Sequence, residues 1–275
     1  MWNGSMQFPF DPIERAREVE ELVMRDNERK YYRFRYQSKW WSPSVADSVG
    51  CCLNCVYCWN FKRNMKLEGT YRSPRYVAGK LKSMSAAHKN DDHAYCMRTG
   101  GCEPILGNQS LDHLISILEW ADCDRFLIAT NGIMFGHDLS FLAKLKPFRD
   151  IVRLRICAKA HDAATFETIT GADKKYFGLP FNALHEANRL EFHVHLASMP
   201  QFVDQYKLRK ASGWKGEMNS EDLPLYPGIA QRLRDRGLWK FNLQFQLISH
   251  LYERKVKVNQ ADLGSKSDYD YQDIT

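Results

Sequence analysis

The sequence lacks the features that would place it in a membrane or secreted class. Its 275 residues contain no run of 18 apolar residues, so a membrane-spanning helix is not expected. The first residues show no basic segment followed by an apolar one, which is why we predict a cytosolic protein without a secretory signal. No internal repeat is clear enough to guide a fold assignment.

The composition is that of an ordinary globular protein. Hydrophobic residues make up 44% of the chain and charged residues 26%, and the mean hydropathy is −0.51. This length suits a single domain of the size of an α/β barrel. The formal net charge of +6 and the pI of about 8.8 permit an anionic partner, nucleic acid included, without requiring one.

Four of the eight cysteines lie within residues 51–58, at Cys51, Cys52, Cys55 and Cys58. Soft thiolates gathered on one loop select zinc or an iron–sulfur cluster. A zinc site usually takes its four ligands from two closely spaced pairs, and the sequence has no second pair. Adjacent side chains tend to point apart, so three ligands are expected, either Cys51, Cys55 and Cys58 or Cys52, Cys55 and Cys58. A zinc knuckle stays open as the alternative.

Short β-rich runs alternate with helical patterns, which predicts an α/β fold with a parallel sheet and helical crossovers. An N-terminal helix from Asp11 to about residue 28 precedes a strand at 29–36, whose alternation predicts one face formed by Tyr32, Phe34 and Tyr36. The other predicted strands are at 45–49, 94–98, 125–130, 151–157, 190–197 and 239–247. The other predicted helices are at 75–84, 111–121, 139–145, 162–190, with breaks at 171 and 178–180, and 229–236.

Polar residues follow several of these strands directly, where the carboxyl ends of a parallel sheet bind ligands. The cysteine loop follows the first strand of the parallel series, and the next strands run into the residues Gly100, Gly101, Glu103, Asn131, Lys159 and His195. Glycines let a backbone come close to a ligand, a carboxylate can accept from an ammonium group, and a lysine can pair with a carboxylate. A β-turn at Asn131 and a core histidine at His195 are the plainer interpretations.

The spacing Cys51-x3-Cys55-x2-Cys58, with the aromatic Tyr57 before the last cysteine, resembles the cluster loop of the radical S-adenosylmethionine (radical SAM) superfamily. The resemblance implies that the three cysteines bind three irons of a four-iron, four-sulfur cluster (4Fe-4S). The fourth iron would take the amino and carboxylate groups of S-adenosylmethionine. Tyr57 would then lie beside the cofactor.

The segment 100–104, Gly-Gly-Cys-Glu-Pro, resembles the Gly-Gly-Glu-Pro motif that binds the methionine amino group in that superfamily, with Cys102 inserted as a filler or a pocket thiol. Residues 130–132 are similar to the turn after the third strand of such enzymes. The segment around Lys159 loosely resembles the branch that activates glycyl-radical enzymes, although Cys157 stands where that branch carries an aspartate.

This resemblance implies a partial (β/α)6 TIM-like barrel over residues 45–250, with a helix and strand extension at 1–44 and a polar tail at 251–275. It implies an enzyme that cleaves S-adenosylmethionine reductively to a 5′-deoxyadenosyl radical, which removes hydrogen from a protein or small metabolite. An electron donor such as a ferredoxin or flavodoxin is implied as a partner. Two alternatives stay open. One is a radical SAM enzyme acting on RNA or a nucleotide, if the basic segment 29–36 and a basic loop predicted at 207–215 form one rim, and the other is a zinc-stabilised binding module.

Overall fold

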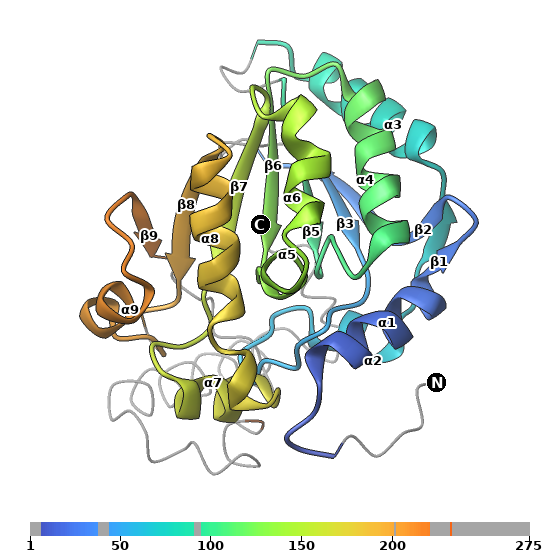
Figure 1. Ribbon diagram of the computed structural model, residues 1–275. Helices are drawn as coiled ribbons and strands as arrows, with labels where there is room; N and C mark the ends of the chain where they lie inside the picture. Colours follow the sequence, from blue (N-terminus) through green and yellow to red (C-terminus); the bar gives the residue numbers. More distant parts are fainter. Residues whose placement is uncertain (1–6, 38–43, 91–94, 201, 221–231, 233–275) are drawn as a thin grey trace, which may run out of the picture.

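The computed structural model describes residues 7–37, 44–90, 95–200, 202–220 and 232. These residues form an α/β structure around one mostly parallel sheet (Figure 1). The predicted strand at 239–247, the tail at 251–275 and all of the predicted helix at 229–236 except residue 232 lie outside the described residues. Within the described residues, no helix has both the length and the apolar character needed to cross a membrane.

The sheet runs in the order β1-β2-β3-β5-β6-β7-β8-β9, and β4 pairs with β2. Its strands are β1 (Met24–Arg25), β2 (Glu28–Tyr36), β3 (Ser44–Ser48), β4 (Thr70–Arg72), β5 (Cys96–Gly101), β6 (Arg125–Thr130), β7 (Val152–Cys157), β8 (His193–Ser198) and β9 (Met218–Ser220). From β3 to β9 all neighbouring strands are parallel, which confirms the predicted fold class. The N-terminal extension continues the same sheet through antiparallel pairing of β2 with β3, and among the described strands the path does not close on itself.

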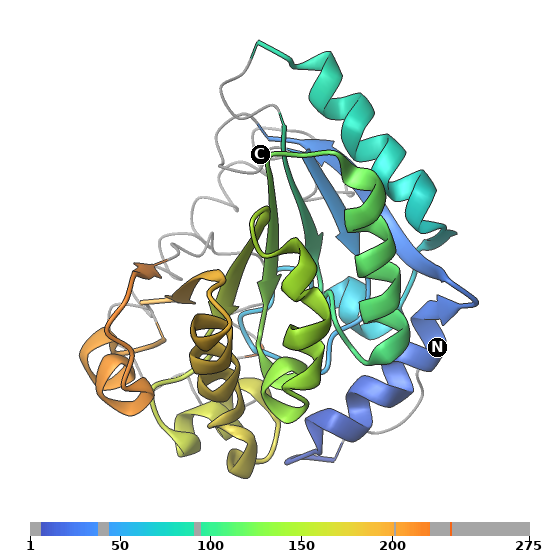
Figure 2. The same cartoon turned by 45° about the horizontal axis from the view of Figure 1, so that its top comes forward.

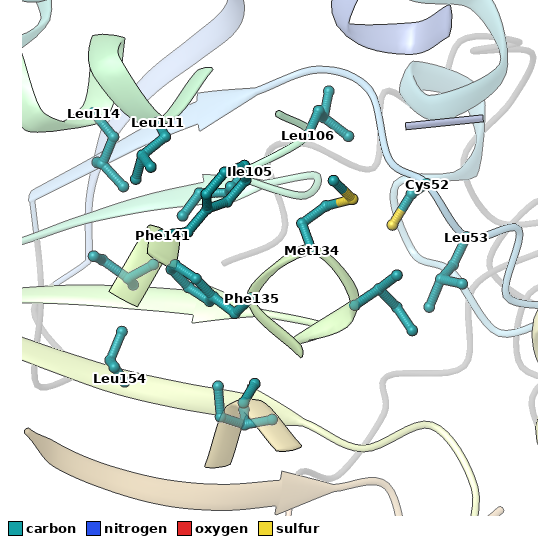
Figure 3. Close-up of a cluster of buried hydrophobic side chains, with 14 of the residues drawn as sticks. Cys52, Leu53, Ile105, Leu106, Leu111, Leu114, Met134, Phe135, Phe141 and Leu154 are labelled. Atoms are coloured by element: carbon teal, nitrogen blue, oxygen red, sulfur yellow. The ribbon is translucent and has the colours of Figure 1, made fainter. Parts of the chain in front are cut away.

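Helices cover one face of this sheet. The α-helices are α1 (Pro12–Val23), α2 (Phe61–Lys66), α3 (Pro74–Ala87), α4 (Asn108–Ala121), α5 (Ile133–His137), α6 (Ser140–Leu145), α7 (Ala163–Thr170), α8 (Leu179–Arg189) and α9 (Gln205–Ser212), with 3-10 turns η1 (Lys146–Phe148) and η2 (Lys174–Tyr176). In two views α4, α6 and α8 lie side by side on the same face (Figures 1 and 2). Their buried residues form one core with the strands, part of which Figure 3 shows.

The long helical pattern at 162–190 is divided where its glycines predict. Asp162 caps α7 by accepting a hydrogen bond from the backbone N–H of Thr165, at 2.7 Å. The helix ends at Gly171, whose φ of +76° is the left-handed conformation common after a helix C-terminus. α8 then begins with a proline in its first turn, where the missing N–H has no intrahelical acceptor.

The aromatic face predicted for the strand at 29–36 is wrong at Tyr32, because Tyr31 lies on the face of Phe34 in its place. A register shift between Tyr31 and Arg33 interrupts the pairing of β2 with β3. Such a bulge moves the following side chains to the other face of the sheet. Tyr31 therefore stacks on Phe34, with ring centroids 5.6 Å apart, although the simple alternation places them on opposite faces.

The segment 207–215, predicted as a basic loop, is mostly helical. Asp204 caps α9 by accepting from the backbone N–H of Lys207, and Leu208 is buried beneath the helix. Gly213, with φ of +63°, ends it. The loop prediction missed the helix because a single apolar anchor in a run of charged residues gives a weak periodic signal.

His113 makes the stability of the fold depend on pH in the acid range. It lies buried in α4, where its Nδ1–H donates to the carbonyl of Asn27 at 2.9 Å and Tyr31 OH donates to its Nε2 at 3.0 Å. A carbonyl cannot donate a hydrogen bond, so Nδ1 carries the proton, and in the neutral ring Nε2 is left to accept from the Tyr31 hydroxyl. Burial lowers the pKa of His113 from 6.5 to about 4.

We expect the free energy of unfolding to fall as the pH drops from about 6.5 to about 4. In that window the unfolded chain binds a proton at His113 that the folded chain does not, and each pH unit costs about 1.4 kcal/mol. Urea unfolding at several pH values gives the free energy of unfolding as a function of pH. Between pH 6.5 and 4 this free energy should fall more steeply for the wild type than for His113→Gln, which has no ring to protonate. Equal slopes would contradict this assignment.

Candidate cluster and cofactor site

The cysteine loop lies between β3 and α2, at the carboxyl end of the parallel strands, and backbone bonds hold it to α7. The N–H groups of Asn54 and Val56 donate to the carbonyls of Thr170 and Ile169, each at 3.0 Å. Just before the loop, the carbonyl of Gly50 accepts a hydrogen bond from the backbone N–H of Glu103, in the turn after β5, at 3.1 Å. These bonds connect the loop to segments far away in the sequence, so its path depends on the whole fold.

Arginine side chains bind three carbonyls of the loop. Arg15 Nε donates to Cys51 O at 3.2 Å, and Arg232 donates from Nε to Val56 O at 2.8 Å and from Nη2 to Cys58 O at 3.1 Å. Two guanidinium groups therefore fix the two ends of the cysteine loop. The sequence analysis missed both arginines, because a lone arginine within a helical pattern gives no motif.

The four thiols of the loop differ in exposure. Cys52 is completely buried and belongs to the hydrophobic core, where Figure 3 shows it with Met134. Cys51 and Cys58 are half-buried, and Cys55 is 7% exposed. Of the two adjacent cysteines, Cys51 is therefore partly exposed at the site, whereas Cys52 lies in the core.

Hydrogen bonds and, to a smaller extent, nearby charges favour a thiolate at Cys51. A hydrogen bond with Cys52 lowers the pKa of Cys51 to about 6 against the effect of burial, with help from the Leu53 N–H and from the charges of Lys159 and Arg15. Burial raises the pKa of Cys52 well above its ordinary value, and it raises the pKa of Cys58 to about 11. Thiolate, not thiol, is the form that binds metals.

Asn131 and Lys159, two of the residues singled out in the sequence, reach this loop. Asn131, directly after β6, donates from Nδ2 to Cys52 Sγ at 3.2 Å and to Cys51 Sγ at 3.7 Å. Lys159, two residues after β7, acts by its charge on the thiols of Cys51 and Cys58. The segments after β6 and β7 therefore place a hydrogen-bond donor, Asn131, and a cation, Lys159, beside the cysteines.

Tyr57 lies inside the site and not at its surface. Its ring is 2% exposed and stacks on Phe202, with centroids 4.5 Å apart. Its hydroxyl donates to the carbonyl of Lys159 at 3.4 Å. Tyr57 thus ties the cysteine loop to the end of β7.

Gly100 and Gly101 end β5, and β3 comes close to both, through the Asp47 side chain at Gly100 and through backbone at Gly101. A Cβ at Gly100 would lie 2.7 Å from Asp47 Oδ1, and one at Gly101 would lie 2.6 Å from the carbonyl oxygen of Ser48. Gly101 also has φ of +83°. Both glycines are therefore required by the approach of the neighbouring strand, whatever ligand the turn also meets.

Glu103 connects this turn to the end of β6. Its buried carboxylate accepts from Thr130 Oγ1 at 2.5 Å and from the backbone N–H groups of Asn131, at 2.8 Å, and Ile105, at 3.4 Å. Burial and then the charge of Cys51 raise the pKa of Glu103 to about 7. Arg29, buried beneath the turn, donates from Nη2 to the Glu103 carbonyl at 2.6 Å.

Two further predicted residues lie at the margins of this group. Cys102 accepts from Asn60 Nδ2 at 3.1 Å and is half-buried, and burial and the charges of Cys58 and Cys51 raise its pKa. His195 is 8% exposed on β8, paired in register with Arg155 of β7. The basic segments 29–36 and 207–215 lie at opposite ends of the strand order, on β2 and beyond β8.

The donor set fits an iron–sulfur cluster in ligand type and number. Three thiols come from one short loop whose backbone is fixed at both ends, and a lysine places positive charge beside them. Among the described residues no group of three His, Cys, Asp or Glu side chains is close enough to hold a single metal ion. A cluster of several irons takes each thiolate on a separate iron, so its ligands need not meet at one point.

Comparisons with protein families and with curated proteins found no match. Among solved structures, the chain is similar to a radical SAM methyltransferase from Sphaerobacter thermophilus, with TM-score 0.49, 14% identity and coverage of 71% of this chain and 64% of that one. It is similar to TYW1 with a lysine-pyruvate adduct bound, with TM-score 0.41, 17% identity and coverage of 70% and 72%.

A third similar structure is Streptococcus suis SuiB bound to S-adenosylmethionine, with TM-score 0.49, 13% identity and coverage of 88% of this chain and 52% of that one. The chain thus spans less than two thirds of the length of the methyltransferase and of SuiB.

Proposed function

We propose that the chain is a radical SAM enzyme, with a 4Fe-4S cluster bound by Cys51, Cys55 and Cys58. The observation that carries the proposal is the cysteine loop itself. The loop carries three thiols in this spacing and lies at the carboxyl end of a parallel sheet. Arg15 and Arg232 bind its carbonyls. Cluster and S-adenosylmethionine together would supply a 5′-deoxyadenosyl radical that removes hydrogen from a substrate.

The burial of Cys52 supports the ligand set that omits it. A completely buried thiol would have to leave the core to reach a cluster, and burial favours its protonated form. Cys51 is more exposed and lies among charges that favour a thiolate. Lys159 and Arg15 would then offset part of the negative charge that the cluster thiolates carry.

The turn from Gly100 to Glu103 is proposed to hold the methionine part of S-adenosylmethionine, with Asn131 and Lys159 near it. This part of the proposal rests on the common neighbourhood of these residues: Glu103 accepts from the Asn131 N–H, and Asn131 donates to Cys51. Tyr57 and His195 complete the proposed contacts, the first through its place on the loop and the second from within β8.

We propose a small acidic electron donor, a ferredoxin or flavodoxin, as the partner. The net charge of +6 supports attraction between the two proteins. The rate of reduction should fall as salt is added, because exposed charges are screened over about 10 Å at 0.1 M ionic strength. Reduction at a rate independent of salt would contradict an electrostatic partner of this kind.

Radical chemistry is tested directly by anaerobic reconstitution of the full chain with iron and sulfide. After reduction, the wild type should produce 5′-deoxyadenosine from S-adenosylmethionine, and Cys55→Ala should produce none. Purified protein that holds zinc without iron or sulfide, and never cleaves the cofactor after reconstitution, would contradict the proposal and favour a zinc-stabilised binding module.

A further inference from the structure

Cys102 is a further thiol beside the cysteine loop, and the proposed function does not use it. Clusters of the four-iron, four-sulfur type are usually held by four cysteine thiolates. The loop offers Cys51, Cys55 and Cys58, since Cys52 lies in the core. One iron of such a cluster would therefore have no protein ligand from the loop.

The backbone holds Cys102 next to the start of the loop. The residue before it, Gly101, pairs in register with Ser48 of β3. The residue after it donates from its backbone N–H to the carbonyl of Gly50 at 3.1 Å, and Cys51 follows Gly50 directly. Neighbouring strands lie about 4.8 Å apart, so the backbone of Cys102 runs one strand spacing from the residues that lead into the loop.

The other end of the loop is connected to Cys102 through Asn60, which lies two residues after Cys58. Asn60 donates from Nδ2 to Cys102 Sγ at 3.1 Å, and its own backbone N–H hydrogen-bonds the Cys58 thiol. Asn60 is itself buried. One residue therefore contacts both sulfur atoms and keeps them in one neighbourhood, although they belong to segments more than 40 residues apart.

The sulfur of Cys102 receives more than one N–H donor. Besides the side chain of Asn60, the backbone N–H of Gly50 hydrogen-bonds it. Hydrogen bonds of this kind stabilise a thiolate and tune the clusters that thiolates bind. A cysteine that only fills space needs no such donors, because it behaves as a small apolar side chain.

Tyr32 adds a buried hydroxyl on the same side of the turn. Its ring lies against Gly101, where a Cβ would be 3.1 Å from Tyr32 Cε1. The hydroxyl has no hydrogen-bond partner among the described residues. Burial raises the pKa of Tyr32, and the charges of Asp47 and Cys102 add to this effect. A cluster held by Cys102 would bring sulfur atoms that can accept from this hydroxyl.

We propose that Cys102 is the fourth cysteine ligand of the cluster while S-adenosylmethionine is absent. The proposal rests on the radical SAM function proposed above. The three thiolates of the loop load the cluster, and Cys102 binds the iron that the loop leaves free. When S-adenosylmethionine binds to that iron, the bond between iron and the Cys102 sulfur breaks, and the released thiolate takes up a proton from water. No electron is transferred in this exchange.

The first test is the resistance of the cluster to oxidation in the reconstituted full chain without S-adenosylmethionine. An iron without a thiolate ligand is lost readily when ferricyanide oxidises the cluster, and the three-iron product has its own electron paramagnetic resonance signal. Cys102→Ala should load a cluster, then lose one iron and show this signal, whereas the wild type should keep its iron. Cys123→Ala, at a half-buried cysteine between α4 and β6, is the matched control and should behave as the wild type.

The affinity for S-adenosylmethionine gives a second readout. A cofactor that must displace Cys102 binds only the fraction of molecules in which the iron is free, so Cys102→Ala should bind it at least about tenfold more tightly than the wild type. Calorimetry on the reconstituted protein before reduction measures this difference. Weaker binding by Cys102→Ala would make Cys102 a contact of the cofactor and would overturn the proposal.

The proposal is also overturned by equal loss of iron from the wild type and Cys102→Ala, or by equal affinity of the two for S-adenosylmethionine. Both results can come from a chain that forms 5′-deoxyadenosine, so they leave the proposed function standing, whereas a chain that loads no cluster contradicts both proposals. Where Cys102→Ala does not fold, Cys102→Ser keeps the size of the side chain and should lose the same iron, because a hydroxyl is a poor ligand in such clusters.

Discussion

Cys51→Ser should abolish cluster loading, whereas Cys52→Ala should leave loading intact. Both side chains are neighbours on the same loop, and they differ in burial: Cys51 is half-buried among charges that favour a thiolate, and Cys52 is enclosed by the core. Serine has nearly the shape of cysteine but its hydroxyl is a poor ligand for iron in such clusters. Iron and acid-labile sulfide per chain after anaerobic reconstitution measure the difference.

Cys52→Ala also has a stability cost that must be kept apart from ligation. Removing a fully buried sulfur leaves a small cavity, and we expect the free energy of unfolding to fall by about 1 to 2 kcal/mol. Cys96→Ala, at a buried cysteine in β5, is the matched control for that cost. Loss of iron from Cys52→Ala with retention in Cys51→Ser would reverse the assignment and make Cys52, Cys55 and Cys58 the ligands.

The sequence could predict the cysteine loop but not what holds it. Spacing along the chain shows which thiols lie close together, because all four cysteines belong to one segment of eight residues, 51–58. Arg15 and Arg232 reach the loop from segments that lie before the sheet and after it, and their role depends on a fold in which these segments meet. The division between Cys51 and Cys52 likewise depends on which side of the loop faces the core.

The parallel strands were predictable because each is a short apolar run between turn residues. The strands at 125–130 and 151–157 are confirmed almost residue for residue as β6 and β7. The bulge in β2 was not predictable, since its alternation of aromatic and basic residues is equally regular in either register. The short elements α2, α5 and β9 were missed because three to six residues carry too little periodicity.

The arginines of the sheet show the same limit more clearly. Arg153 and Arg155 are visible as alternating residues in one strand, and a solvated edge is the ordinary interpretation of such a pattern. Only the register across β5, β6 and β7 shows that they share a face with Arg98. Charge that is scattered along the sequence becomes a concentrated surface once the order of the strands is known.

Gly101→Ala should lower the free energy of unfolding by at least about 3 kcal/mol. Alanine at φ of +83° is strained by about 1 to 3 kcal/mol, and its Cβ would lie 2.6 Å from the carbonyl oxygen of Ser48 on the adjacent strand. Backbone atoms within a paired sheet cannot move aside as a flexible side chain can, so the parallel pairing of β3 with β5 must yield. Urea unfolding measures this loss.

Gly79→Ala is the matched control, because Gly79 is exposed within α3 and a Cβ there meets no atom within 4 Å. It should raise the free energy of unfolding by about 0.5 to 1 kcal/mol. Gly101 leads into Glu103, whose N–H donates to Gly50 O next to Cys51, so Gly101→Ala should also reduce the iron bound by folded protein. A stable Gly101→Ala variant with full cluster loading would show that this turn tolerates a side chain and that the close approach of β3 does not position the cysteine loop.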